Sequence, residues 1–254
     1  MTLFIRHFKT SCRLWACGLT LWTTPAAAQS GGWEDSAFVN ANLAIQSGAR
    51  PFADVLTPVI YTQPASVVAT HPVAGGMLPL DLAGGIRVRG SLGFGLGFTK
   101  FALTDIADVA AKIPNPVPAN AARSAATTAE VARADTAFHL LALWVVPITD
   151  HIDVAFSGGP SLIWVTQDRV SEVAIAEDSP TFATVAISEV GIAGYKDRVL
   201  GMHGGADVTY FLTPMIGVGG GVRYVRGSTP ADGNGAAIDV GGLQMGVGVR
   251  IRVR

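Results

Sequence analysis

The feature that most constrains this chain is a two-residue alternation between large apolar side chains and glycine. Between Leu92 and Phe98, leucine or phenylalanine occupies every second position, and glycine fills the positions between them. Between Leu243 and Val253 the apolar residues alternate instead with Gln, Gly and Arg. Successive side chains of a strand point to opposite faces, so these segments predict strands with one apolar face and one small or polar face.

The composition of the second face favours a membrane barrel over a soluble sheet. A solvent-facing sheet usually carries Lys, Glu and Thr, whereas this face is mostly glycine, which weakens strands and marks crowded positions. The interior of a narrow closed barrel is crowded, while its exterior meets lipid. Glycine accounts for 30 of the 254 residues, and only 15% of the residues are charged. A barrel with its apolar face outward explains both values.

Short and long connections alternate along the chain, as in outer-membrane barrels with tight periplasmic turns and longer external loops. Counting predicts an all-β fold, an eight-stranded antiparallel transmembrane β-barrel. The expected strands cover about 37–47, 79–89, 91–102, 135–148, 151–168, 198–212, 215–226 and 238–253. The expected external loops cover about 48–78, 104–134, 170–197 and 227–236. Each strand has the roughly 9–11 residues that a tilted crossing needs.

Two of the long connections bear on the strand count. Segment 104–134 is rich in alanine and contains three prolines, which predicts a mobile loop. Segment 48–78 holds two strand-like runs, Val55 to Thr62 and Ala65 to Thr70. They form a hairpin above the membrane, extend the first two strands, or cross the membrane and make ten strands.

Residues 1–28 have the pattern of a secretory signal peptide, and residues 29–254 form the barrel domain. Three basic residues precede the apolar run Leu14 to Trp22, and Ala26, Ala27 and Ala28 supply a small-residue cleavage site. Both cysteines lie inside this signal, so the mature chain has no thiol chemistry. Acylation of Cys17 is the alternative. A signal followed by barrel strands predicts localisation in the outer membrane.

The last strand matches the pattern that barrel-insertion machinery reads: a polar residue, a glycine, and two apolar residues at fixed spacing. The matching residues are Gln244, Gly246, Val249 and Ile251. The chain departs from the bacterial form at its end, because Val253 and Arg254 replace a terminal aromatic residue. The expected partners are therefore this machinery and outer-membrane lipid.

Four segments resemble the small outer-membrane β-barrel domain proteins of Gram-negative bacteria, which belong with OmpA/OmpX-like barrels. The resemblance covers most of the chain after the signal. It implies the fold and the location, and it says little about activity. The segments are DLAGGIRVRGSLGFGLGFTKF (81–101), HLLALWVVPITDHIDVAFSGGPS (139–161), GGADVTYFLTPMIGVGGGVRY (204–224) and VGGLQMGVGVRIRV (240–253).

Candidate chemistry is sparse. No two histidines after the signal have metal-ligand spacing. His139 falls on a predicted inward face with Ser157 and Ser161 on the next strand, and His203 is also inward. Lipid-deacylating barrels place such residues outward, so interior hydrogen bonding is the expectation. We expect no catalytic residue, metal site or cofactor. With 18 basic against 19 acidic residues, we also expect no nucleic-acid partner.

The inward charges are the informative set. An Arg that faced lipid near the midplane would cost about 2–4 kcal/mol, so charges in the strands are expected inside, where opposite charges can pair. This predicted lumen charge network consists of Asp81, Arg87, Asp153, Asp207, Arg223, Arg250 and Arg252.

Two interpretations of this network stay open. Either it plugs the lumen, which eight strands leave nearly filled, or it lines an ion-conducting path. We expect a monomer with a structural or surface-interaction role, whose loop partner the sequence does not identify. The alternatives are a narrow porin-like channel and a lipid-modifying enzyme.

Overall fold

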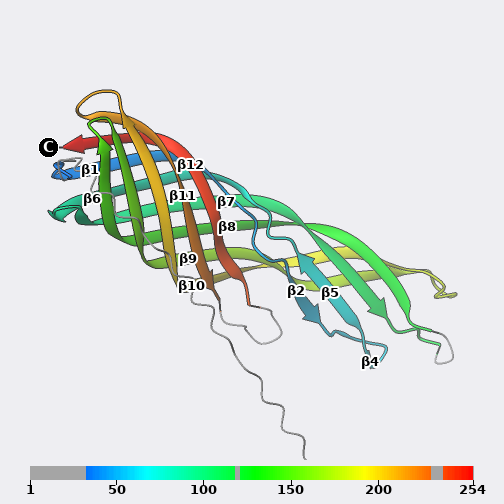
Figure 1. Cartoon of the computed structure of the whole chain (residues 1–254). Helices are drawn as coiled ribbons and strands as arrows, with labels where there is room; N and C mark the ends of the chain where they lie inside the picture. Colours follow the sequence, from blue (N-terminus) through cyan, green and yellow to red (C-terminus); the bar gives the residue numbers. More distant parts are fainter. Residues whose placement is uncertain (1–32, 118–120, 230–236, 254) are drawn as a thin grey trace, which may run out of the picture.

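The computed structural model describes residues 33–117, 121–229 and 237–253 (Figure 1). The expected signal peptide lies outside the described residues, as does most of the expected loop 227–236. Among the described residues, no helix is long and apolar enough to span a bilayer.

Eight strands form a closed antiparallel ring. Each strand pairs with the next in the series, and β1 closes the ring by pairing with β12 from Ala37↔Val253 to Gln46↔Gln244. The eight-stranded barrel predicted from the alternation, and implied by the resemblance, is confirmed. The strands are β1 (Ala37–Gln46), β6 (Gly76–Arg89), β7 (Leu92–Ile113), β8 (Arg123–Thr149), β9 (Ile152–Glu177), β10 (Val185–Phe211), β11 (Ile216–Ser228) and β12 (Asp239–Val253).

Three short turns join strands at one end of the ring, at the positions that the sequence predicted. Gly90 and Ser91 connect β6 to β7, Asp150 and His151 connect β8 to β9, and residues 212–215 connect β10 to β11. Gly90 has a φ of +56°, a conformation that glycine adopts without a steric penalty. Both ends of the described chain lie at this same end of the barrel (Figure 1).

Four strands continue far beyond the ring and correct two of the expected loops. β7 and β8 stay paired up to Ile113↔Arg123, and β9 and β10 stay paired up to Glu177↔Val185. The expected loops 104–134 and 170–197 are therefore strand over most of their length. The prediction of a mobile loop at 104–134 was wrong because buried and exposed residues alternate along β7 and β8 through most of this segment, and Pro114 and Pro116 follow the end of β7.

The expected loop 48–78 forms a hairpin outside the ring. It contains β2 (Phe52–Leu56), β3 (Val59–Ile60), β4 (Gln63–Pro64) and β5 (Ser66–His71). β5 pairs with the extension of β7, from Ser66↔Lys112 to Thr70↔Asp108. The ten-strand alternative is therefore wrong, because these strands add to the extension rather than to the ring.

The hairpin and the strand extensions together make a second body, the distal lobe (β2 to β5 with residues 100–117, 121–134 and 166–198; Figure 1). Its buried core is made of small and branched side chains that include Val67, Ala69, Val109 and Val170. These come from both the β5–β7 sheet and the β9–β10 ribbon, so the lobe is held together by sheet-on-ribbon packing.

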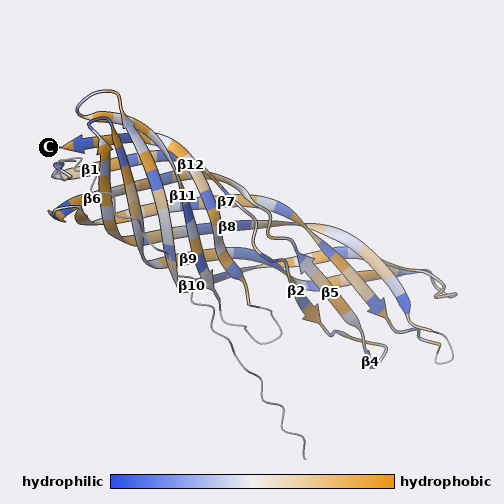
Figure 2. Cartoon of the chain, viewed as in Figure 1, coloured by the Kyte–Doolittle hydropathy of each residue, from blue (hydrophilic) through white to orange (hydrophobic). Residues whose placement is uncertain are grey.

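The apolar face changes side where the strands leave the ring. On β7, the outward residues from Leu92 to Leu96 are apolar and exposed, whereas the outward residues Lys100 and Lys112 are charged. The inward residues change in the opposite sense, from glycine in the ring to Val109 and Ile113 in the lobe, and both are buried. Figure 2 shows hydrophobic and hydrophilic residues alternating along the strands of both parts.

Candidate functional site

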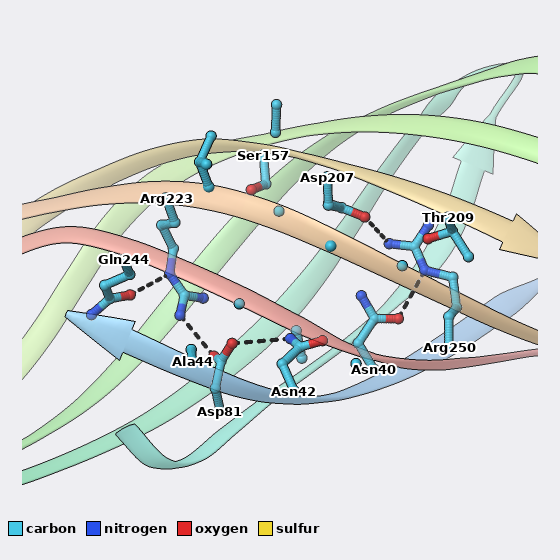
Figure 3. Close-up of a pocket in the computed structure, with 18 of the residues that line it drawn as sticks. Asn40, Asn42, Ala44, Asp81, Ser157, Asp207, Thr209, Arg223, Gln244 and Arg250 are labelled. Atoms are coloured by element: carbon cyan, nitrogen blue, oxygen red, sulfur yellow. Dashed lines mark hydrogen bonds and ion pairs between the residues drawn. The ribbon is translucent and has the colours of Figure 1, made fainter. Parts of the chain in front are cut away.

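The lumen of the ring contains a cavity of about 90 Å³, which is lined by both polar and apolar side chains (Figure 3). Two groups of charged and amide side chains face one another across it. In the first group, Arg223 Nη2 lies 2.7 Å from Asp81 Oδ1, and Arg223 Nε donates to Gln244 Oε1 at 2.7 Å. Asn42 Nδ2 donates to the second oxygen of Asp81 at 3.0 Å. Four strands are thus joined through one guanidinium and one carboxylate.

Arg250 is the centre of the second group. It forms an ion pair with Asp207, and its Nε donates to Asn40 Oδ1 at 2.8 Å (Figure 3). Its guanidinium carbon also lies 4.6 Å from the centroid of the Phe38 ring, within cation–π range. The Asp207 side chain keeps 30% of its surface exposed, because this pair lines the cavity and is not fully enclosed by other side chains.

The other predicted charges lie near the short-turn end. Arg252 Nη1 lies 3.6 Å from both Asp35 and Asp153, and Arg252 Nε donates to the Pro214 carbonyl at 2.8 Å. Arg87 donates instead to the Trp33 carbonyl at 2.7 Å and is exposed at the rim. The structure therefore divides the predicted network into three separate groups with Arg87 at its edge.

A chain of hydrogen bonds runs through the inward histidines. His139 Nε2 lies 3.1 Å from Thr99 Oγ1, and His139 Nδ1 lies 2.7 Å from Ser161 Oγ. Ser161 Oγ also lies 2.9 Å from His203 Nδ1, and the two imidazole rings are 4.9 Å apart. All four side chains are buried. This arrangement links β7, β8, β9 and β10 inside the barrel wall.

Apolar clusters lie in the lumen on either side of the polar side chains. Farther from the short turns, a buried cluster includes Ile163, Val199 and Val225. Nearer the short turns, a second cluster includes Phe38 and Leu143. Ile163, Val199 and Val225 lie two or four residues beyond Ser161, His203 and Arg223 on the same strands, which sets the order of the layers.

The distal lobe contains a charge cluster that the sequence analysis missed. Arg169 on β9 forms an ion pair with Asp54 on β2, and His71 Nε2 on β5 lies 3.2 Å from the same carboxylate. The Arg169 guanidinium carbon lies 5.4 Å from the ring centroid of Phe52 and 5.1 Å from that of Tyr195. The cluster ties the hairpin to the β9–β10 ribbon.

The charges in this cluster perturb the Asp54 carboxyl group. Burial alone would raise the pKa of Asp54, but hydrogen bonds from His71 and Arg169 outweigh it and lower the pKa to about 2. No local pattern marks these residues, because Arg169 lies 115 positions from Asp54 in the chain.

The four residues of the expected insertion signal divide between the two faces of β12. Gln244 is buried and donates Nε2 to Gln46 Oε1 at 2.7 Å, whereas Val249 and Ile251 are exposed on the outer face. Gly246 lies beside Ala44, where an added Cβ would come within 2.8 Å of the Ala44 Cβ.

Within the described ranges, no group of three His, Cys, Asp or Glu side chains is placed to hold a metal ion.

Comparisons with known proteins concern the fold. No protein-family model matches the chain, and no curated protein matches it by sequence. Among solved structures, the outer membrane protein OprG from Pseudomonas aeruginosa is 10% identical, with 87% of this chain and 96% of that chain covered and a TM-score of 0.47.

Two further solved structures match this chain over a similar share of its length. The outer membrane protease OmpT from Escherichia coli is 10% identical, with 85% of this chain and 96% of that chain covered and a TM-score of 0.47. Neisserial surface protein A is 13% identical over 85% of this chain and 96% of that chain, with a TM-score of 0.39. At such low identity the function of this chain has to be inferred from its own residues.

Proposed function

We propose that this chain is a monomeric outer-membrane β-barrel with a closed lumen, which holds a rigid β-lobe at the cell surface for a structural or interaction role. The observation that carries the proposal is the reversal of the apolar face between the ring and the lobe. A ring that is apolar outside and polar inside suits lipid, and a lobe that is polar outside and apolar inside suits water.

Aromatic side chains support a membrane boundary at the point of reversal. Phe98, Phe138 and Trp164 lie side by side on the outer face, with centroid separations of 4.9 Å and 5.5 Å. Trp144 and Tyr210 are exposed near the short turns at the other end of the apolar band. Two aromatic girdles of this kind mark the two interfaces of outer-membrane barrels.

The orientation follows from secretion. The start of β1 and the end of β12 lie at the short-turn end of the barrel. A chain that is exported and then inserted keeps its termini in the periplasm. The distal lobe then faces the outside of the cell. Its packed core makes it a fixed platform rather than a set of loops, which suits the presentation of a surface to another molecule.

A closed lumen fits the layers of side chains inside the ring. Two apolar clusters lie in the lumen, one that lines part of the cavity and one beyond it toward the lobe, and the Arg side chains at the cavity are held by carboxylates and amides rather than left free. The narrow channel is the second candidate, because the 90 Å³ cavity and the partly exposed Asp207 offer room for a few water molecules.

A role without catalysis is part of the proposal. Ser161 and His139 are buried in the lumen, away from the lipid-facing side where a lipid-modifying enzyme would meet an acyl chain.

Cell fractionation combined with surface labelling tests the proposal. A cysteine placed at Ala110 in the lobe should react with a membrane-impermeant maleimide on intact cells, whereas one at Asp150 should react only after the outer membrane is permeabilised. The protein should be found in the outer-membrane fraction. Folded protein recovered from the soluble periplasm, or labelling at position 150 alone, would overturn the location or the orientation.

A further inference from the structure

The distal lobe contains a second cavity at its end away from the ring, where β4 lies (Figure 1). Its volume is about 240 Å³, more than twice that of the lumen cavity of about 90 Å³. Two connections form its walls, the β3–β4 turn and the chain that follows β7. Its polar lining consists of Gln63, Ser66, Lys112 and Asn115.

These polar side chains carry hydrogen-bonding groups that the described residues leave unused. Asn115 is buried, with 9% of its surface exposed. Its Oδ1 accepts a hydrogen bond from Val117 N at 2.9 Å, whereas its Nδ2 donates to no other group in the described part of the chain. Among the same residues, Lys112 forms no ion pair, and the side chains of Gln63 and Ser66 form no hydrogen bond. A group that enters the cavity would satisfy these donors, which are costly to leave unpaired.

The walls of the cavity are held from inside the lobe. Arg123 donates Nη2 to the Pro114 carbonyl at 2.9 Å, and it forms an ion pair with Glu177 of β9. Glu177 also accepts a hydrogen bond from the Tyr61 hydroxyl, which ties the β3–β4 turn to the same pair. Tyr61 and Thr62 have φ angles of +52° and +61°, which residues other than glycine adopt only where surrounding contacts impose them. The cavity is therefore preformed.

The lining matches a ligand that is negatively charged and rich in hydrogen-bond acceptors. Lys112 is the one charged side chain among the described lining residues, and Asn115 offers only donors because its oxygen is already used. Ser66 is the register partner of Lys112 and adds a hydroxyl beside it on the outer face of the sheet. The rest of the described lining is C–H surface, supplied by Pro64, Pro114 and Ala122.

We infer that this cavity binds a sugar acid, a single sugar ring that carries a carboxylate. Drug-sized ligands occupy about 300–1,000 Å³, so a cavity of 240 Å³ suits one ring rather than a longer chain. Lys112 and Asn115 donate to the carboxylate, Gln63 and Ser66 bond to ring hydroxyls, and the proline rings cover a C–H face. The inference rests on the proposed interaction role of the lobe, to which it adds a ligand class and a site.

A matched pair of sugars tests the inference. Methyl glucuronide and methyl glucoside share one ring and differ in a carboxylate that replaces a hydroxymethyl group. The full mature chain is refolded in zwitterionic detergent micelles, and saturation-transfer NMR titrations give the dissociation constant of each sugar. We expect the glucuronide to bind about tenfold more tightly, the factor that corresponds to about 1.4 kcal/mol. Equal dissociation constants for the two sugars would overturn the inference.

Three variants separate the site from the general charge of the lobe, each with its fold checked by circular dichroism. Lys112→Gln should bring the two dissociation constants together, because an amide replaces the ammonium group. Asn115→Asp keeps an oxygen for Val117 N but places a carboxylate oxygen at the Nδ2 position, so it should abolish glucuronide binding. Lys100→Gln removes a cation from the same outer face of β7 outside the cavity and should change nothing. Equal losses in the two lysine variants would overturn the site.

Competition with inorganic phosphate identifies the ligand chemistry. Displacement of the glucuronide by an equal concentration of phosphate, but not by chloride of the same ionic strength, would reveal a simple anion site and overturn the assignment to a sugar acid. The titrations use purified protein, so they do not depend on where the protein resides. Glucuronide binding by a protein that fails the surface-labelling test would keep the site and refute the proposed location. Correct labelling without binding would do the reverse.

Discussion

At the residue scale, the inward charges of the lumen have room because glycine lies opposite them on the adjacent strand. Asp207 is the register partner of Gly221, and Arg223 is the register partner of Gly205. A Cβ added at Gly221 would lie 2.8 Å from the Asp207 Cβ, closer than real contacts allow. Glycine weakens a strand, but at these positions it makes space for the side chains that pair across the lumen.

Removal of Arg250 should destabilise the barrel by leaving Asp207 without its charged partner. We expect Arg250→Ala to lower the free energy of unfolding by about 1–3 kcal/mol, the cost of an unsatisfied buried polar group. The double variant Arg250→Ala/Asp207→Asn should recover part of this loss, because its side chain at position 207 is neutral. Unfolding in denaturant after refolding into lipid vesicles measures both values.

The exposed residue Lys112 provides the control for this measurement. Lys112→Ala changes the net charge equally but lies on the outer face of the lobe, so its effect should stay within about 0.5 kcal/mol. An Arg250→Ala variant as stable as the control would show that water in the cavity solvates Asp207 fully. The pair would then contribute nothing to stability.

At the element scale, β7 crosses from lipid to water within a few residues, and the change can be mapped. A spin label at outward Leu96 should be accessible to oxygen dissolved in the lipid phase. A label at outward Ala110 should be accessible to a water-soluble nickel complex instead. We expect the change of accessibility between positions 98 and 102, because Phe98 ends the apolar series and Lys100 follows it.

Inward positions of β7 supply the control for this accessibility scan. A label at Ala111, which is buried in the lobe core, should be shielded from both reagents. Oxygen accessibility at both position 96 and position 110 would mean that the lobe strands are also in lipid. In that case the apolar band would extend beyond the ring, and the membrane boundary proposed at Phe98 would be wrong.

The attachment of the hairpin to the β9–β10 ribbon of the distal lobe should weaken in acid. The pKa of Asp54 is lowered to about 2 from the ordinary value of 3.8, so its ionised form is stabilised by folding. This stabilisation is present above pH 3.8 and is lost as the pH falls through about 2. At about 1.4 kcal/mol per pKa unit, the contribution is about 2 kcal/mol.

A spin label at exposed Thr70 on β5 can follow this weakening. Its mobility should rise as the pH falls between those two values, and Asp54→Asn should raise the mobility at neutral pH and remove most of the pH dependence. The rest of the lobe is identical in both proteins, so the difference between them isolates Asp54. Identical titrations for wild type and Asp54→Asn would contradict the role of this carboxylate.

How much of the molecule the sequence predicted depends on the range of the interactions involved. The ring strands and their faces follow from a local two-residue period, and Val249 and Arg250 illustrate the predicted outward and inward sides. The extensions were missed because their buried apolar residues, mainly Ala, Val and Ile, occupy the face opposite to that of the apolar residues in the ring. The Asp54, His71 and Arg169 cluster was missed because only tertiary pairing brings these three residues together.

At the scale of the whole molecule, the lumen alternates between apolar and polar layers along the barrel axis. The cluster that includes Phe38 and Leu143 lies toward the short turns and lines part of the cavity. The Asp81–Arg223 pair, the Asp207–Arg250 pair and the histidine chain lie in the middle, and the cluster that includes Ile163 and Val225 lies toward the lobe. A narrow apolar constriction excludes ions by dewetting even where the adjacent layer is polar. The closure is therefore expected from the apolar layers rather than from the salt bridges.

This order of layers predicts that neutralising an ion pair does not open a pore. In planar bilayers, both the wild-type protein and the D81N/R223Q variant should show no steady conductance, because Ile163 and Phe38 still occupy the lumen on either side of the altered pair. The neutral side chains can still hydrogen-bond to Asn42 and Gln244. Insertion of each protein is verified beforehand by electron paramagnetic resonance, from the fraction of spin-labelled lipid whose motion the protein restricts. An absence of conductance then cannot result from failed reconstitution.

Resolved conductance steps in the variant alone would show that the Asp81–Arg223 pair itself closes the path. Steps in the wild type would establish the narrow channel, since ions would then pass the apolar layers that we propose as the seal.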